Sequence, residues 1–523
     1  MIMLTTPVPF SWHTSILLPS LLFHIALAGI PRPEQFFDEQ LVDHLFDDNR
    51  VRQQLYSQRF YTLDEHFLGP GHPIFLILGG EGAISPETGI FYPFIGDHLA
   101  AQWGAFVLEP EHRFYGKSQP LNSTAVKKVE ENLRVKLFTP EQALHDALTL
   151  LDHVRGNQLG CSRDRASPEY CPIISVGGSY PGWLSAMARI MFPNVVDMAY
   201  AASAPMGFYS QQVDQFSYYN HITNVAETLI PGCKVATQSA LHDVELAILT
   251  SDDLAATSIG MCEGTVPDYV FQDDDPNTRM VEELMMVVGY TFANDNMSDY
   301  PPSTATRFYK ACETFTSQSL TSIEKVKQFL VERLSRKDDS DNSTRCWAMT
   351  LQMPSGPHAT ISSGDWSGVG TGDNGESWDF QTCTLLVEAI GFSKDSMFVP
   401  REWSLEWLTR HCQSRFGVTP RPYEIVQKWH FDDLVTYNVS HILFTNGLKD
   451  GWSVSGIKSN LSDSLVALNF PNGAHHSDLS HLGPNRNDTE DIEQGYKAIS
   501  RILGQWLRDV KSAMPSISEV SVF

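Results

Sequence analysis

Residues 171–191 constrain the fold more than any other part of the sequence. An apolar run at 171–176 predicts a buried strand, and the two glycines after it permit a very tight turn before a helical pattern at 183–191. This succession is typical of a nucleophile elbow, which lifts one serine oxygen, here that of Ser179, above a parallel sheet. Pro181 stands where the common Gly-x-Ser-x-Gly pattern has its second glycine, and Gly182 follows it. A glycine-rich turn with a bystander serine therefore stays an alternative.

Two segments near the C-terminus supply an acid and a histidine in the order that hydrolases with such an elbow use. Residues 441–445 predict a strand that leads to Asp450, and residues 465–470 predict a strand that leads to His475 and His476. Asp450 and His475 are 25 residues apart, which is enough for one strand and its connections. Both can therefore reach the elbow at the carboxyl edge of a sheet. From the residues alone, His475 and His476 are equivalent candidates.

The order of the predicted elements indicates an α/β fold. Strands are expected at 74–78, 105–108, 171–176 and 196–202, and a helix with a capping sequence is expected to begin at Thr139. Strands that alternate with helices in this way predict a mostly parallel sheet covered by helices.

Between residues 205 and 437 the pattern changes to helical segments and polar loops, and six of the eight cysteines lie there. We expect this segment to be a mainly helical, disulfide-containing cap. It would be inserted into one catalytic domain made of residues 29–204 and 438–523.

The N-terminal residues 1–28 have the character of a signal peptide. They contain an apolar stretch that ends in Ala26-Leu27-Ala28, a small-x-small cleavage pattern, and the stretch is too short to span a membrane. We expect a protein of the secretory pathway that resides in a lysosome, in a vacuole or outside the cell. The net charge of −25 argues against nucleic acid or anionic lipid as a partner.

Cysteines and glycosylation sequons agree with that compartment. Eight cysteines are consistent with four disulfides in an oxidising lumen, and Cys161 and Cys171, which flank a polar loop, are expected to pair. No Cys-x-x-Cys pair occurs, and we expect neither a metal nor a cofactor. Sequons stand at Asn122, Asn296, Asn342, Asn438, Asn460 and Asn487.

Seven short motifs occur along the chain in a fixed order. They are residues 37–44 with 58–61, 79–82, 111–118, the elbow, 378–384, 446–452 and 473–479. Together they resemble the serine peptidase family of lysosomal Pro-X carboxypeptidase and dipeptidyl peptidase II, which also includes the thymus-specific serine protease and fungal prolyl endopeptidases. The resemblance extends from about residue 33 to about residue 507.

This resemblance implies an α/β-hydrolase fold with an inserted helical cap. It implies Ser179, Asp450 and His475 as a catalytic triad, with the first histidine of the pair as the catalytic one. It also suggests three further disulfides, which join Cys233 to Cys312, Cys262 to Cys346, and Cys383 to Cys412.

The chemistry of such a triad predicts further site residues. An oxyanion requires two backbone N–H donors. One is expected from Tyr180, the residue after the nucleophile, and the other from Gly80 or Glu81 in the loop after the strand at 74–78. Trp183 and Trp452 are expected as aromatic walls for a proline ring, with two core tryptophans as the alternative.

We therefore expect a serine exopeptidase that cuts short, proline-containing peptides on the carboxyl side of proline through an acyl-enzyme. An esterase or lipase of the same fold, or a prolyl endopeptidase, is the alternative. Leu385 stands where the family often has Glu, with Glu388 three residues further on, so the choice between a carboxypeptidase and a dipeptidyl peptidase stays open. The oligomeric state also stays open, with a homodimer as one alternative.

Overall fold

The computed structural model describes residues 32–45, 54–84, 92–121, 130–250, 258–262, 265–266, 274–335, 345–349, 375–479 and 483–512. The predicted signal peptide and the sequons at Asn122 and Asn342 lie outside these residues.

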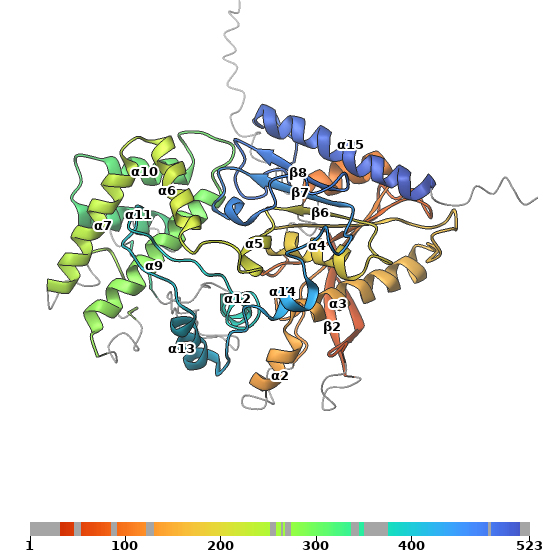
Figure 1. The fold of residues 1–523 in the computed structure, drawn as a ribbon, viewed down its shortest axis with the longest axis horizontal. Coiled ribbons are helices and arrows are strands. Elements are labelled where there is room, and N and C mark those ends of the chain that lie inside the picture. Colours follow the sequence, from red (N-terminus) through yellow and green to blue (C-terminus); the bar gives the residue numbers. More distant parts are fainter. Residues whose placement is uncertain are drawn as a thin grey trace, which may run out of the picture.

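Within the described residues the strands form one eight-stranded sheet in the order β1-β2-β4-β3-β5-β6-β7-β8 (Figure 1). The strands from β3 to β8 pair in parallel, whereas β1 and β2 form an antiparallel hairpin at one edge that the sequence did not lead us to expect. The strands that we did expect are confirmed. The bounds are β1 Gln35–Leu41, β2 Leu55–Leu63, β3 Ile74–Ile77, β4 Phe106–Pro110, β5 Ile173–Gly178, β6 Met198–Ala202, β7 Ile442–Gly447 and β8 Leu465–Phe470.

Helices cover both faces of the sheet. On one face, α3 (Pro140–His153) and α4 (Tyr180–Met191) bury their apolar sides in one core, which also contains Leu76 of β3. On the other face, α15 (Glu490–Ser512) and α1 (Ala100–Trp103) pack into a second core, which contains Phe75 of the same strand. Successive residues of β3 thus point to opposite cores, as expected for a buried parallel strand.

The start of α3 follows the sequence prediction. The hydroxyl of Thr139 accepts the backbone N–H of Gln142, and Pro140 occupies the first turn, where its missing N–H costs nothing.

The described residues between β6 and β7 are mainly helical and have a core of their own, which includes Leu241, Phe292 and Phe329. Figure 1 shows α6, α7, α9, α10 and α11 gathered beside the sheet. The predicted α/β-hydrolase fold with a helical insertion is confirmed, whereas the boundaries 205 and 437 stay a prediction. The helices are α5 Met206–Tyr209, α6 Ser217–Leu229, α7 Cys233–Thr250, α9 Pro276–Met297, α10 Arg307–Thr316, α11 Ser322–Leu334, α12 Gly375–Thr382, α13 Leu405–Phe416 and α14 Glu424–Trp429.

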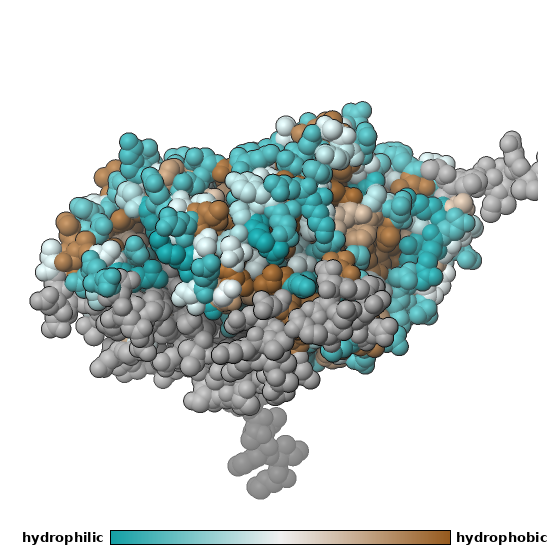
Figure 2. All heavy atoms as spheres, turned by 60° about the horizontal axis from the view of Figure 1, so that its bottom comes forward, coloured by the Kyte–Doolittle hydropathy of each residue, from teal (hydrophilic) through white to brown (hydrophobic). Residues whose placement is uncertain are grey.

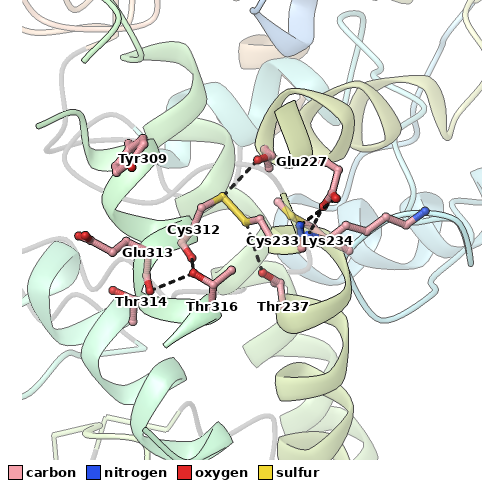
Figure 3. Close-up of a disulfide and its surroundings, with 12 residues drawn as sticks. Glu227, Cys233, Lys234, Thr237, Tyr309, Cys312, Glu313, Thr314 and Thr316 are labelled. Carbon is pink, nitrogen blue, oxygen red and sulfur yellow. Dashed lines mark hydrogen bonds between the residues drawn. A yellow bond between two sulfur atoms is a disulfide. The ribbon is translucent and has the colours of Figure 1, made fainter. Parts of the chain in front are cut away.

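Four disulfides join the eight cysteines in the expected pairs: Cys161–Cys171, Cys233–Cys312, Cys262–Cys346 and Cys383–Cys412. Figure 3 shows the bond that ties the first residue of α7 to α10. Beside it, the carboxylate of Glu227 accepts the backbone N–H groups of Gly232 and Lys234 at 2.8 and 3.0 Å, which supports the turn into α7.

The sequons within the described residues differ in exposure. Asn438, Asn460 and Asn487 are exposed, and their glycosylation stays a prediction. The expectation for Asn296 is wrong, because this side chain is fully buried: its amide donates to the carbonyl of Lys449, and its oxygen accepts the N–H of Gly451.

On the face that Figure 2 shows, hydrophilic residues are interspersed with hydrophobic ones. Among the helices described, none combines the length and the hydropathy that crossing a bilayer requires.

Candidate active site

Ser179 lies between the end of β5 and the start of α4 in a conformation that a side chain rarely adopts, with φ 64° and ψ −133°. Two glycines permit this turn. A Cβ on Gly177 would lie 2.1 Å from the carbonyl oxygen of Pro181, and a Cβ on Gly182 would lie 2.5 Å from that of Ala202. The second glycine that the tight turn requires is therefore Gly182 rather than residue 181, which explains the departure from the common pattern.

Asp450 and His475 meet above the carboxyl ends of β7 and β8. Nδ1 of His475 donates a hydrogen bond to Oδ2 of Asp450 at 2.6 Å, and the carboxylate is fully buried. The other carboxylate oxygen, Oδ1, accepts the backbone N–H of Trp452 at 3.1 Å, which fixes its direction. The two strand ends can approach this closely because Gly447 has no side chain: an added Cβ would lie only 2.0 Å from the carbonyl oxygen of Ala474.

The second histidine of the pair has different surroundings. The ring of His476 packs against the chain before the serine, where a Cβ on Gly178 would lie 2.8 Å from it. The backbone N–H of His476 donates to the hydroxyl of Ser203 at 2.9 Å, and its φ is 37°. Asp450 thus bonds to the ring of His475, whereas the ring of His476 packs beside the elbow.

The loop after β3 lies directly over the first turn of α4. A Cβ on Gly80 would come within 2.6 Å of Cγ of Pro181, so this loop can approach the elbow only with glycine there. The first N–H groups of a helix have no acceptor within the helix, and that of Tyr180 is the first of α4. The expected oxyanion donors Tyr180, Gly80 and Glu81 therefore lie on two neighbouring segments.

A buried polar network supports the start of α4 from below. The hydroxyl of Tyr180 bonds to Nε2 of His112 at 3.0 Å and accepts from the amide of Gln381 in α12 at 3.2 Å. Gln381 in turn accepts from the hydroxyl of Tyr115 at 2.7 Å. Burial lowers the pKa of His112 to about 4, so this ring is neutral and holds Tyr180 rather than exchanging protons.

Ser179 and His475 line one cavity of about 700 Å³. Its walls combine residues of the sheet edge with residues of the helical segment between β6 and β7, and they are rich in aromatic rings. These rings include Tyr92, Tyr209, Tyr290, Tyr300, Trp378 and Trp452. Trp452 was expected there, and Trp378 belongs to a motif noted in the sequence. Tyr209 and Tyr290 had no signal in the sequence beyond their residue type.

The expectation that Trp183 forms a pocket wall is wrong. Its ring contacts neither the solvent nor the cavity. It is buried in the core, where it packs against Tyr209, Trp429 and Phe431. Residues around α14 cover this side of α4, so a large apolar ring one turn after the serine is buried as core. The core alternative noted from the sequence therefore holds for Trp183.

Three carboxyl side chains also line the cavity, those of Glu81, Glu109 and Glu388. Burial raises the pKa of Glu81, and burial together with the charge of Glu81 raises the pKa of Glu388 to about 8. The hydroxyl of Tyr209 lies 3.4 Å from Oε1 of Glu388. The sequence drew attention to Glu388 only as a glutamate three residues past the usual family position.

One group of side chains elsewhere has the composition of a metal site. Asp379, Cys383 and His411 lie close together and are buried. However, Cys383 is bonded to Cys412 in a disulfide, and Asp379 pairs with Arg415 at 2.8 Å. The thiolate that a metal would bind is therefore missing, and the group is a buried ion-pair network that fastens α12 to α13.

Comparisons with known proteins point to one family of peptidases. Residues 40–499 match the family model described as serine carboxypeptidase S28. The chain is 27% identical to the lysosomal Pro-X carboxypeptidase of Mus musculus over 473 residues, which cover 87% of each chain. It is 26% identical to that of Homo sapiens over 484 residues, 90% of this chain and 88% of the relative. It is also 27% identical to the thymus-specific serine protease of Mus musculus over 498 residues, 92% and 89% of the two chains.

Proposed function

Because the chain belongs to the serine carboxypeptidase S28 family and is a serine peptidase, we propose that it is an exopeptidase cutting short peptides after proline. Ser179 is the nucleophile, His475 the general base and Asp450 the residue that orients the histidine. The observation that carries this assignment is the 2.6 Å hydrogen bond between His475 and the buried Asp450, beside a cavity that His475 shares with Ser179.

In this mechanism, Oγ of Ser179 forms a bond to the carbonyl carbon of the substrate while its proton passes to His475. Nδ1 of His475 is engaged by Asp450, so Nε2 is the nitrogen that takes the proton. The carbon–nitrogen bond then breaks, and His475 gives the proton to the leaving amine. Water repeats the sequence on the acyl-enzyme and releases the acid.

The negative oxygen of the tetrahedral intermediate is bound by the N–H of Tyr180 and by one N–H of Gly80 or Glu81. Two observations support these donors: the N–H of Tyr180 stands at the open end of α4, and Gly80 packs on Pro181 in the same turn. Donors fixed by the backbone need no reorganisation as charge develops, which is why such sites lower the barrier strongly.

The aromatic walls of the cavity favour a proline ring in the substrate. Trp378 and Trp452 both line the cavity, and flat apolar rings bury proline without requiring hydrogen bonds from it. A concave site whose walls come from both the sheet edge and the helical segment also favours short peptides or chain ends over folded proteins. The relatives named Pro-X carboxypeptidase point in the same direction.

We further propose that the protein acts in the secretory pathway, with a lysosome, a vacuole or the extracellular space as its location. Support comes from four disulfides, which persist in oxidising compartments, and from the relatives named lysosomal.

The test is a set of peptides of equal length with proline at varied distances from each end, beside matched peptides with alanine in its place. We expect cleavage after proline near one end, with a higher kcat/KM than for the alanine peptides, and no cleavage by Ser179→Ala. Equal rates on both series would contradict the proline preference. Cleavage only in the middle of long peptides would indicate an endopeptidase, and preferred hydrolysis of acyl esters would indicate an esterase.

A further inference from the structure

Glu388 and Glu81 reach the catalytic cavity from two different parts of the fold. Glu388 follows α12, is 7% exposed and lines the cavity. Glu81 follows β3, in the loop that packs on the elbow, and lines the same cavity. Glu109 of β4 lines the cavity too, so carboxyl groups border the space that a substrate would fill next to Ser179.

The carboxyl groups of Glu388 and Glu81 are in an unfavourable electrostatic environment. Burial raises both pKa values, and the charge of Glu81 raises that of Glu388 further. The hydroxyl of Tyr209 at 3.4 Å is a long and neutral donor to Glu388. A positive group that entered the cavity would offset both the cost of ionising a buried carboxyl group and the repulsion between the two, because an opposite charge favours the ionised form.

Among the described residues that line the cavity, none is a lysine or an arginine. A carboxypeptidase must hold the free carboxylate of its substrate, for which arginine or lysine is the usual partner. A free carboxylate beside Glu81 and Glu388 would find no such partner among the lining residues described, and whichever of the two side chains is ionised would repel it. The electrostatics of the cavity thus favour a cationic end of a peptide over an anionic one.

We infer that Glu388, together with Glu81, binds the free α-ammonium group of the substrate's N-terminus. This inference rests on the proposed function and refines it. An ammonium group bound inside the cavity leaves room for only a short N-terminal stretch between Glu388 and Ser179. The acyl group transferred to Ser179 is then a short N-terminal fragment ending in proline, and the enzyme acts as an aminopeptidase of the dipeptidyl type.

The experiment compares four substrates with the wild-type protein: alanyl-prolyl-aminomethylcoumarin, its N-acetyl form, acetyl-lysyl-prolyl-aminomethylcoumarin, and acetyl-alanyl-prolyl-phenylalanine. We expect kcat/KM for the free amine to exceed that of the acetylated form by about 100-fold, the upper range for a hydrogen bond between charged groups. Equal kcat/KM values for these two substrates would overturn the inference. So would a higher kcat/KM for release of phenylalanine from the fourth substrate than for cleavage of the free-amine substrate. Equal rates for acetyl-lysyl and free alanyl substrates would overturn the assignment to the N-terminus, because a side-chain ammonium would then serve as well.

Variants locate the effect. Glu388→Gln should lower the ratio of kcat/KM for free to acetylated substrate by about 10-fold or more. Glu402→Gln, an exposed glutamate in the same segment, should leave the ratio unchanged. The same ratio in both variants would contradict a role for Glu388.

A binding measurement separates this inference from the catalytic proposal. Calorimetry on Ser179→Ala should show tighter binding of alanyl-proline amide than of its N-acetyl form. If the wild-type protein turned over none of the substrates and a phosphonate did not label Ser179, the proposed function would be wrong, whereas the ammonium site would still be tested by the binding measurement. Equal binding of the two amides would overturn the ammonium site even if the peptidase activity stands.

Discussion

Nδ1 of His475 donates to a carboxylate oxygen of Asp450 over 2.6 Å, and that carboxylate is fully buried. Since the carboxylate fixes the tautomer of the ring, Asp450→Asn should reduce kcat by roughly 10⁴-fold while the protein still folds. Steady-state kinetics with a proline-containing peptide checks this, and thermal unfolding controls for the fold. Asp463→Asn, a change at an exposed aspartate in the loop before β8, should have no effect on kcat. A modest loss in Asp450→Asn would show that another acid orients the histidine.

The two adjacent histidines should differ in their effect on catalysis. His475→Ala removes the proposed general base and should cost several powers of ten in kcat. His476→Ala removes a ring that packs on Gly178 and should cost less than about 100-fold, through a loosened floor beside the elbow. Parallel kinetics on the two variants decides the assignment, and the reverse order of the losses would exchange the two roles.

The elbow should not tolerate a methyl group on Gly182. The added Cβ would lie 2.5 Å from the carbonyl oxygen of Ala202, so Gly182→Ala should lower stability by about 1–3 kcal/mol and reduce activity by moving Ser179. Gly504→Ala is the matched control in a helix, since its Cβ would meet Trp103 at an ordinary 3.6 Å. Helix propensity predicts that this control stabilises by up to about 1 kcal/mol. Denaturant unfolding measures both, and an unaffected Gly182→Ala would contradict the close approach of α4 to β6.

The pH dependence of stability should reveal the buried state of Glu388. Its pKa is raised from the ordinary 4.5 to about 8, so folding takes up a proton at this group between these pH values, and the contribution of Glu388 to stability falls as pH rises through this window. Glu388→Gln cannot ionise and should gain stability relative to wild type as pH rises from about 5 to about 8. The difference should approach about 4 kcal/mol at most, since each pKa unit corresponds to about 1.4 kcal/mol. Thermal unfolding across this range checks it, and a pH-independent difference would mean that Glu388 titrates normally.

The sequence predicted the parts of the molecule that local patterns determine. The apolar runs gave the inner strands, because a buried parallel strand has to be apolar on both faces. Thr139 and Pro140 gave the start of α3, because capping depends on only a few neighbouring residues. Ser179, Asp450 and the pair His475 and His476 became candidates because each follows a strand of the sheet, and parallel strands bring their carboxyl ends to one edge. The choice of His475 over His476 came from the family resemblance alone.

Features that depend on tertiary packing could not be predicted in this way. The sequence around Trp183 is equally compatible with a ring that lines a cavity and with one buried in the core. Its neighbours Trp429 and Phe431, which bury it, come from a distant segment. Asn296 satisfies the sequon pattern, but its burial depends on the loop after β7, where it bonds to Lys449 and Gly451. Glu388 became a cavity residue only once the fold had placed the segment after α12 near the elbow.

The most direct test of the account is the site of covalent labelling by a serine-reactive phosphonate, mapped by mass spectrometry. The account predicts that one molecule of reagent binds per chain, that it is attached to Ser179, and that His475→Ala slows the labelling by several powers of ten while Ser179→Ala abolishes it. Labelling at another serine, or labelling of Ser179 at the same rate without His475, would contradict the assignment of Ser179 and His475 as nucleophile and base.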